Sequence, residues 1–147
     1  MTHSLLTEEK PFPPQSSLSA PYWQAARSGK LVVQKCTACG KLRHYPTLLC
    51  PSCHATSVDW VPLSGRGRIH SWTVTHHAFH PAFRELLPLT LVTVDMDEGV
   101  RALGVWRGSE LKLGQLVQAR FVVDGQRADL EFDPVHGQSC PINASLI

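Results

Sequence analysis

The chain has 147 residues, of which 43% are hydrophobic and 18% charged, so it is long enough for one domain or for one domain and a small module. It contains no run of about eighteen apolar residues, which excludes a membrane-spanning helix. Its first residues lack the basic, apolar and small-residue succession of a secretory signal, and we therefore expect a cytoplasmic protein.

The formal net charge of +2 hides an uneven distribution. Between Lys10 and Arg84 there are nine Lys or Arg residues and one acid, Asp59, whereas from Glu85 onward five basic residues stand against nine acids. A basic first half favours an anionic partner, such as a nucleic acid, a phosphorylated cofactor or an acidic protein surface. The alternative is a basic face that is only solvated.

Changes in composition divide the chain into four parts. Residues 1–20 are rich in proline and serine, which predicts a flexible arm because proline fixes φ and removes hydrogen-bond donors. Residues 21–62 hold a predicted helix and two pairs of cysteines, and residues 63–133 have the pattern of an all-β domain. Residues 134–147 show no periodicity and are expected to form a loop or tail.

The predicted helix covers residues 22–28. Pro21 suits its first turn, and Gly29 suits its C-terminal cap. Tyr22 and Trp23 are neighbours on the face that the helix would bury. We expect Trp23 to fix the helix to the core, whereas Tyr22 either does the same or lines a ligand cleft.

Short strands are expected on both sides of the cysteines. Leu31–Val33 is one, and after Pro62 alternating apolar and polar residues predict five more, over about 65–75, 89–95, 100–106, 117–123 and 129–133. Five short strands with glycine-rich turns fit a small barrel of the OB type better than a seven-stranded sandwich.

Four of the five cysteines form two CxxC pairs, Cys36 with Cys39 and Cys50 with Cys53, separated by ten residues. Four thiolates on two tight knuckles can meet around one zinc ion, and a shell closed by four cysteines leaves no position for water or substrate. The spacing therefore favours one structural zinc ion. The alternatives are an iron centre of the rubredoxin kind and two disulfides, although a cytoplasmic setting argues against disulfides.

Two further residues lie near this pattern without a predicted role in it. His54 follows the second pair and is expected at the surface, since the four cysteines suffice as ligands. Cys140 stands alone in the tail with no neighbouring group to activate its thiol. The predicted fold is mainly β, with an N-terminal helix, a rubredoxin-like zinc ribbon and a five-stranded OB-fold barrel.

The order of these parts resembles a known family: zinc-ribbon plus OB-fold proteins first catalogued as a domain of unknown function and later tied to acyl-CoA metabolism. The resemblance covers residues 21–133 and is specific as a combination of motifs. Its motifs are Pro21-Tyr22-Trp23, Lys30 to Gly40, Arg43-His44-Tyr45-Pro46, Cys50 to Cys53, Trp60 to Gly67, Ser71 to Val74, Leu91 to Asp95 and Leu113 to Val117.

The resemblance implies an accessory subunit, not an enzyme in its own right. Members of the family associate with thiolases, thiolase-like aldolases, hydroxymethylglutaryl-CoA synthases or MaoC-like hydratases, hold the CoA ester or scaffold the catalytic chains. The partner then supplies the catalytic residues. The residues agree with this, since the chain contains no G-x-S-x-G elbow, no phosphate-binding glycine loop and no obvious pair of carboxylates.

If the ligand is an acyl-CoA, its phosphates would be held by charge-assisted hydrogen bonds from Arg and Lys. The candidates are Lys41 and Arg43 in the ribbon and Arg66 and Arg68 at its junction with the barrel. Because Arg66, Arg68, His70 and Trp72 alternate on one strand, we expect them to project to the same side as one stripe, with Trp72 as a stacking surface for adenine. The alternative is an exposed barrel face with Trp72 folded into the core.

A second candidate is the loop after the first barrel strand, which carries an unusual number of histidines and aromatic residues. We expect it to contact a partner enzyme or to cover the acyl chain. Zinc binding by its histidines, proton transfer and a merely solvated loop are the alternatives. The residues concerned are His76, His77, Phe79, His80, Phe83 and Arg84.

Two other functions compete with the CoA-binding accessory subunit. Zinc ribbons and OB barrels both commonly bind nucleic acid, and a basic first half would serve that role. Against it, the isoelectric point near 8.4 is modest, and exposed aromatics interleaved with basic residues are sparse on the predicted strands. The other competitor is a scaffold that holds the partner enzyme without touching the substrate.

Overall fold

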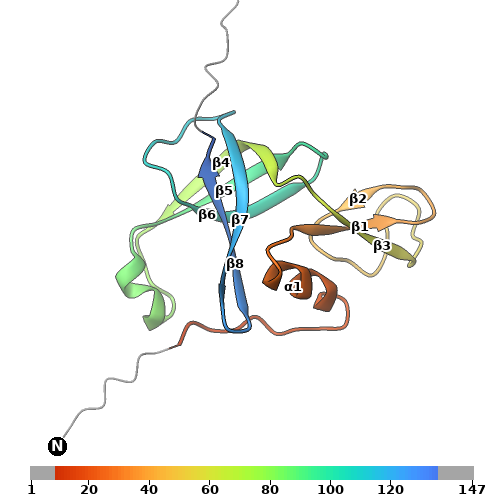
Figure 1. The fold of residues 1–147 in the computed structure, drawn as a ribbon, viewed down its shortest axis with the longest axis horizontal. Helices are drawn as coiled ribbons and strands as arrows, with labels where there is room; N and C mark the ends of the chain where they lie inside the picture. The colour runs from red at the N-terminus through yellow and green to blue at the C-terminus, as the bar shows by residue number, and fades with distance from the viewer. Residues whose placement is uncertain (1–8, 136–147) are drawn as a thin grey trace, which may run out of the picture.

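The computed structural model describes residues 9–135, which form a short helix, a three-stranded sheet and a closed five-stranded barrel (Figure 1). The predicted mainly β fold, with an N-terminal helix, a four-cysteine ribbon and an OB-type barrel, is confirmed. The helix packs against strands of both the ribbon and the barrel, so it joins the two parts (Figure 1). Within the described residues, no helix has the length and apolarity needed to cross a membrane.

Helix α1 (Ala20–Arg27) begins two residues earlier than predicted, since Pro21 already lies within its first turn. It ends where Gly29 adopts a φ of +77°, a conformation that favours glycine. Tyr22 is 8% exposed and belongs to the core, and Trp23 packs against the same core as predicted.

The ribbon is an antiparallel sheet with β1 (Val32–Cys36) between β2 (Leu42–Arg43) and β3 (Val58–Pro62). The predicted strand Leu31–Val33 overlaps β1, whereas β2 and β3 were missed because their segments are short and lack strict alternation. Val33 and Gln34 are both fully buried, so β1 is covered on its two faces. The strand ends at Cys36 and thereby delivers the first cysteine to the metal site.

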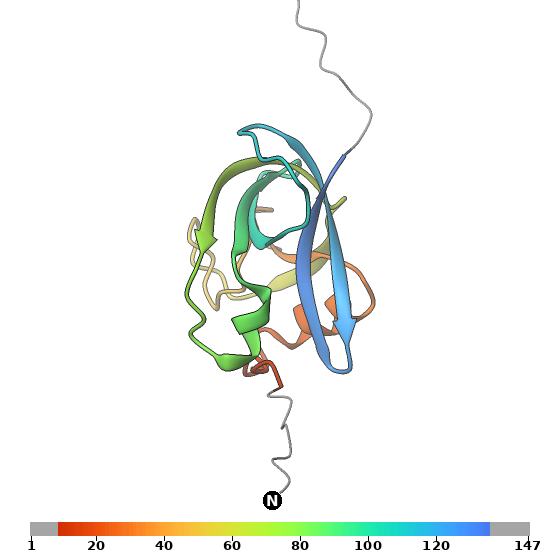
Figure 2. The same cartoon turned by 90° about the vertical axis from the view of Figure 1, so that its left-hand side faces the viewer.

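The barrel follows the ribbon and closes through one parallel pair of strands. Its order is β4-β5-β6-β8-β7, with β6 and β8 parallel and the other neighbours antiparallel (Figure 2). A 3-10 helix, η1, lies in the connection between β4 and β5. The bounds are β4 (Arg66–Thr75), η1 (Pro81–Leu86), β5 (Leu89–Met96), β6 (Arg101–Trp106), β7 (Leu116–Asp124) and β8 (Arg127–Pro134).

Apolar side chains from all five strands fill the barrel, and Tyr22 of α1 belongs to the same cluster. The inward-facing residues are almost fully buried, as expected for a close-packed interior. They include Ile69, Val92, Val94, Ala102, Val117 and Phe132.

Aromatic contacts hold the ribbon against the helix and the barrel. The ring of His44 lies with its centroid 5.6 Å from that of Tyr22 and 4.0 Å from that of Tyr45. The Tyr45 hydroxyl accepts a hydrogen bond of 3.2 Å from the amide of Leu103 in β6. Since β8 pairs only with the end of β6, at Val105 and Trp106, the tyrosine satisfies an amide on the open part of that strand.

The buried His44 makes stability depend on pH. Burial lowers its pKa from 6.5 to about 4, so the folded protein keeps the ring neutral while the unfolded chain protonates it. The unfolded state then binds more protons, and the free energy of unfolding should fall as the pH drops from about 6.5 toward about 4.

His44→Phe keeps an aromatic ring and removes this titration. Urea unfolding at about pH 7 and about pH 5.5, with zinc in excess, should show a smaller loss of stability in His44→Phe than in the wild type. Equal losses in the two proteins would contradict a neutral, buried His44, because every other titratable group is shared.

Candidate functional site

The fold brings the four paired cysteines together, as predicted from their spacing. The Sγ atoms of Cys36, Cys39, Cys50 and Cys53 all lie within 4.8 Å of one another. Cys36 ends β1 and Cys39 lies in the turn that follows, whereas the other two lie in the loop before β3, so the site joins segments on both sides of β2. The four cysteines form a zinc-ribbon-type metal site.

The sulfur separations fit a metal tetrahedron and do not fit disulfides. Cys36 Sγ lies 3.5 Å from Cys53 Sγ, and Cys39 Sγ lies 3.6 Å from Cys50 Sγ. Zinc–sulfur bonds of about 2.3 Å at tetrahedral angles put neighbouring sulfurs about 3.8 Å apart, whereas a disulfide needs about 2.05 Å. The predicted alternative of two disulfides therefore disagrees with this geometry.

The backbone prepares the sulfurs for a metal ion. Amides of Cys53 and Ser52 donate hydrogen bonds to the Cys50 sulfur and lower the pKa of that thiol to about 6. The two knuckles have the same turn, closed by hydrogen bonds from Gly40 N to Cys36 O and from His54 N to Cys50 O. His54 has a φ of 58° at the position where the first knuckle has glycine, and it is exposed as predicted.

Arg43, one of the predicted phosphate contacts, is buried in the structure. Its side chain is only 6% exposed and donates hydrogen bonds to Gln34 Oε1 at 2.6 Å and to the Thr47 carbonyl at 3.2 Å. The same Gln34 oxygen also accepts from the Thr47 amide. Arg43 thus fixes the loop that follows β2 and, unlike the other predicted phosphate contacts, is not exposed. The sequence alone could not predict that Arg43 is buried, because its partner Gln34 lies on a different strand.

The predicted stripe along β4 is interrupted. A register shift between Ile69 and Ser71 places Trp72 opposite the inward-facing Val92, whereas Arg68 lies opposite the exposed Asp95. Trp72 therefore turns to the other face of the sheet from Arg68, and it remains 40% exposed toward the end of the strand. An extra residue in one strand shifts the alternation by one, which is the ordinary effect of a β-bulge.

The remaining predicted phosphate contacts are exposed but do not share one cleft. Arg66 and Arg68 stand at the start of β4, where Arg68 Nη1 donates to the Gly114 carbonyl at 3.1 Å. Lys41 is exposed on the ribbon beside the first knuckle. None of them lines the groove described next. Their role in CoA binding stays a prediction.

That groove has a volume of about 780 Å³ and lies against the outside of the barrel, over β5, β6 and the gap between β6 and β8. Leu89 and Leu91 alternate along β5 with the inward-facing Val92 and Val94, so they project outward into it. The apolar floor consists of Leu89, Leu91, Leu103 and Val105, and Leu130 of β8, which packs against the barrel core, borders it.

Four separate segments build the walls of the groove. The N-terminal arm, helix α1, the ribbon loop after β2 and the connection between β4 and β5 all contribute. The wall residues include Lys10, Pro11, Tyr22, Trp23, Tyr45, Pro46, His77, Phe79, His80, Phe83 and Leu86. Tyr22 belongs to the core and also lines the groove, and whether the groove is a ligand cleft stays a prediction.

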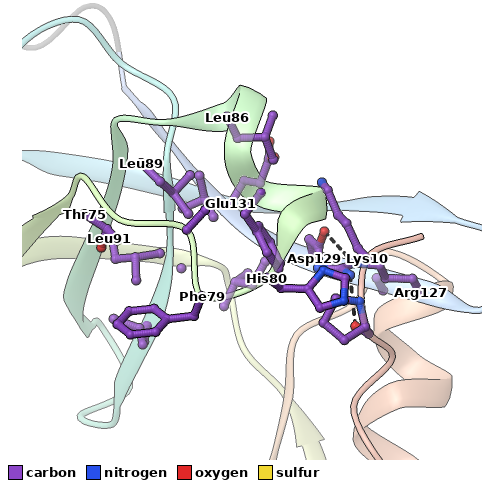
Figure 3. A pocket seen from close by; sticks show the side chains of 18 of the residues that line it. Lys10, Thr75, Phe79, His80, Leu86, Leu89, Leu91, Arg127, Asp129 and Glu131 are labelled. Carbon is purple, nitrogen blue, oxygen red and sulfur yellow. Dashed lines mark hydrogen bonds and ion pairs between the residues drawn. The ribbon is translucent and has the colours of Figure 1, made fainter. Parts of the chain in front are cut away.

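The two ends of the groove differ in polarity. Figure 3 shows Lys10, His80, Arg127 and Asp129 gathered at one end, with apolar side chains toward the other. Arg127 Nε lies 2.8 Å from both carboxylate oxygens of Asp129, and its Nη1 donates to the Pro11 carbonyl. Lys10 Nζ lies 5.8 Å from the centre of the Phe83 ring and has no ion pair among residues 9–135.

A buried carboxylate also borders the groove, and two guanidinium groups neutralise it. Glu131 is 3% exposed, and its Oε1 accepts a hydrogen bond of 2.8 Å from Arg107 Nε. Its Oε2 lies 2.8 Å from Nη2 of Arg120. Nε of the same arginine lies 2.6 Å from Oδ2 of Asp133. The ion pairs leave Glu131 without free negative charge toward the groove.

Four of the six loop residues selected from the sequence line the groove, namely His77, Phe79, His80 and Phe83, whereas His76 and Arg84 do not. Sequence reasoning missed Lys10, Arg127 and the leucine floor. One signal was present: Leu89 to Val94 carries apolar residues at both alternating positions, a pattern of strands covered on both faces.

Loss of one cysteine should remove the metal ion and unfold the ribbon. In Cys36→Ser we expect zinc to fall from one ion per chain to well below one, since binding the metal and folding the ribbon are one event. Elemental analysis measures the metal, and it also separates zinc from iron. Cys140→Ser is the matched control and should keep the full metal content. A Cys36→Ser protein that retains one zinc ion per chain would contradict the assigned ligands.

Comparison with known proteins identifies the two parts of the chain. Residues 23–59 match the family model described as the ChsH2 rubredoxin-like zinc ribbon domain, and residues 60–122 match the ChsH2 C-terminal OB-fold domain. The chain is 38% identical over 100 residues to a probable enoyl-CoA hydratase alpha subunit of Thermomonospora curvata. It is 30% identical over 113 residues to the 3-oxo-4,17-pregnadiene-20-carboxyl-CoA hydratase alpha subunit of Mycobacterium tuberculosis.

These matches cover 65% and 75% of this chain but 31% and 35% of the relatives, so the chain spans about a third of their length. Among solved structures, it resembles a chain of the Ltp2-ChsH2(DUF35) aldolase, with a TM-score of 0.76 and 31% identity over 84% of this chain and 98% of that one. A DUF35 protein of unknown function from Sulfolobus solfataricus shares the fold, with a TM-score of 0.58 at 13% identity over 82% of this chain and 87% of that one. The chain therefore belongs to the ChsH2 (DUF35) family of zinc-ribbon and OB-fold proteins.

Proposed function

We propose that the chain is an accessory subunit of an enzyme complex that processes acyl-CoA esters. It binds or positions the ester, and a thiolase-like or MaoC-like hydratase partner supplies the catalytic groups. The observation that carries this proposal is the likeness to nearly the whole of a chain from the Ltp2-ChsH2 aldolase, at 31% identity. That likeness covers 84% of this chain and 98% of the other.

The curated relatives support the same class of substrate. Both are named as alpha subunits of hydratases that act on CoA esters, which indicates multi-subunit enzymes. Their names describe chains about three times as long as the part matched here. We therefore transfer to this chain the association with such an enzyme, and assign the catalytic step to the partner.

Zinc would have a structural role in this subunit. The four cysteine sulfurs would hold the ion, which supplies a cross-link between the two knuckles of the ribbon. Tyr45 and Pro46, on the loop between the knuckles, line the groove, and Tyr45 also binds β6 through its hydroxyl. The metal site would thus keep one wall of the groove in place.

The groove is the part of the chain best suited to a CoA ester. Its volume lies within the range of about 300–1,000 Å³ that is usual for small-molecule sites. Arg66, at the start of β4, stands nine residues from the groove residue Thr75 at its end, which corresponds to about 30 Å of extended strand. Arg66 and Arg68 could therefore contact only a distant part of a ligand that enters the groove.

Purification of the tagged chain from its source cell tests the proposal. We expect a thiolase-like or hydratase-like enzyme to co-purify in a fixed ratio and to be identified by mass spectrometry. The complex should withstand moderate salt, since an interface between subunits depends largely on apolar burial. Recovery of the chain alone, or with RNA that is lost as salt rises, would contradict the proposal and favour the nucleic-acid alternative.

A further inference from the structure

We infer that the groove binds the apolar acyl group of the CoA ester, and that the anionic CoA part extends out of the groove beside Lys10. This inference rests on the proposed function and deepens it, because it assigns the ligand to one site on this chain. The groove would select for long or bulky acyl groups over short ones.

The floor supplies the first argument. Leu89, Leu91, Leu103 and Val105 form a continuous apolar surface on the outside of the barrel, where a solvated OB-fold strand would carry polar residues. Leu103 is still 46% exposed, so the chain alone leaves part of this surface uncovered. A bound acyl group would bury it, and each buried methylene group would tighten binding by roughly fourfold.

The charges supply the second argument. Three cations, Lys10, Arg107 and Arg127, border the groove against two carboxylates, Asp129 and Glu131. Both carboxylates are paired with arginines, so among these three cations Lys10 alone has no ion pair to a described residue. An anionic carrier complements this end of the groove, and a neutral or cationic ligand would not.

The walls indicate a small molecule and not a segment of a partner protein. The arm, α1, the ribbon loop and the β4–β5 connection surround the floor from different directions. Phe79 stands at the rim with its side chain 91% exposed, in position to fold over a ligand or to meet a partner. Walls from four separate segments of the chain favour a concave site for one small ligand over a flat docking surface.

The test compares two thioesters, acetyl-CoA and dodecanoyl-CoA, by isothermal titration of the zinc-loaded full chain, alone and with its co-purified partner. We expect dodecanoyl-CoA to bind at least about tenfold more tightly than acetyl-CoA. Leu91→Trp should fill the groove and abolish this difference. The matched control is Leu113→Trp, which places the same side chain at a leucine that is 69% exposed and outside the groove.

Further variants separate the two parts of the ligand and guard against misfolding. Leu103→Glu changes a half-exposed leucine, so the protein should keep its metal content and circular dichroism spectrum while losing the preference for dodecanoyl-CoA. Lys10→Glu should weaken the binding of both thioesters by a similar factor, so that the ratio of their dissociation constants stays unchanged. Arg66→Ala with Arg68→Ala tests the other predicted phosphate contacts in the same way.

Two outcomes would overturn the inference and leave the proposed function standing. One is a partner that co-purifies while the two thioesters bind equally. The other is that Leu91→Trp and Leu103→Glu release the partner but keep the preference for dodecanoyl-CoA, which would make the groove a docking site for a partner segment. If no partner co-purifies and neither thioester binds, the proposed function itself fails.

Discussion

An apolar patch on the outside of the barrel governs the arrangement of the other elements. Small barrels usually expose the outer faces of their strands, but here β5 and β6 place Leu89, Leu91, Leu103 and Val105 on that side. Large exposed apolar patches are unfavourable in water, so the arm, the helix, the ribbon loop and the β4–β5 connection gather around it. The groove is the space that these four segments leave uncovered.

The ribbon and the groove are therefore coupled through the fold. The metal site holds the two knuckles, the buried Arg43 and Gln34 fix the loop between them, and that loop carries Tyr45 to the edge of β6. His44 adds a tilted ring contact with Tyr22 of the helix, which also lines the groove. The ribbon thus shapes one side of the proposed site.

Local patterns were enough to predict the metal site and the strands of the barrel. The cysteine spacing acts over a few residues, and alternation along a strand reflects one buried face, so both can be read without tertiary structure. The groove could not be predicted in this way, because Lys10, Tyr45, Leu91 and Arg127 meet only in three dimensions. Two predicted positions were wrong for the same reason. Arg43 is buried next to its partner on another strand, and Trp72 faces the other side of the sheet because of a β-bulge.

Hydrogen–deuterium exchange on the chain with its partner, with and without dodecanoyl-CoA, tests the central claim most directly. The account predicts slower exchange in the connection between β4 and β5 and at the open part of β6, where the amides border the groove. Exchange near Arg66 and Arg68, at the far end of β4, should stay unchanged. Protection confined to the Arg66–Arg68 end, or no protection anywhere in this chain, would contradict the assignment of the acyl group to the groove.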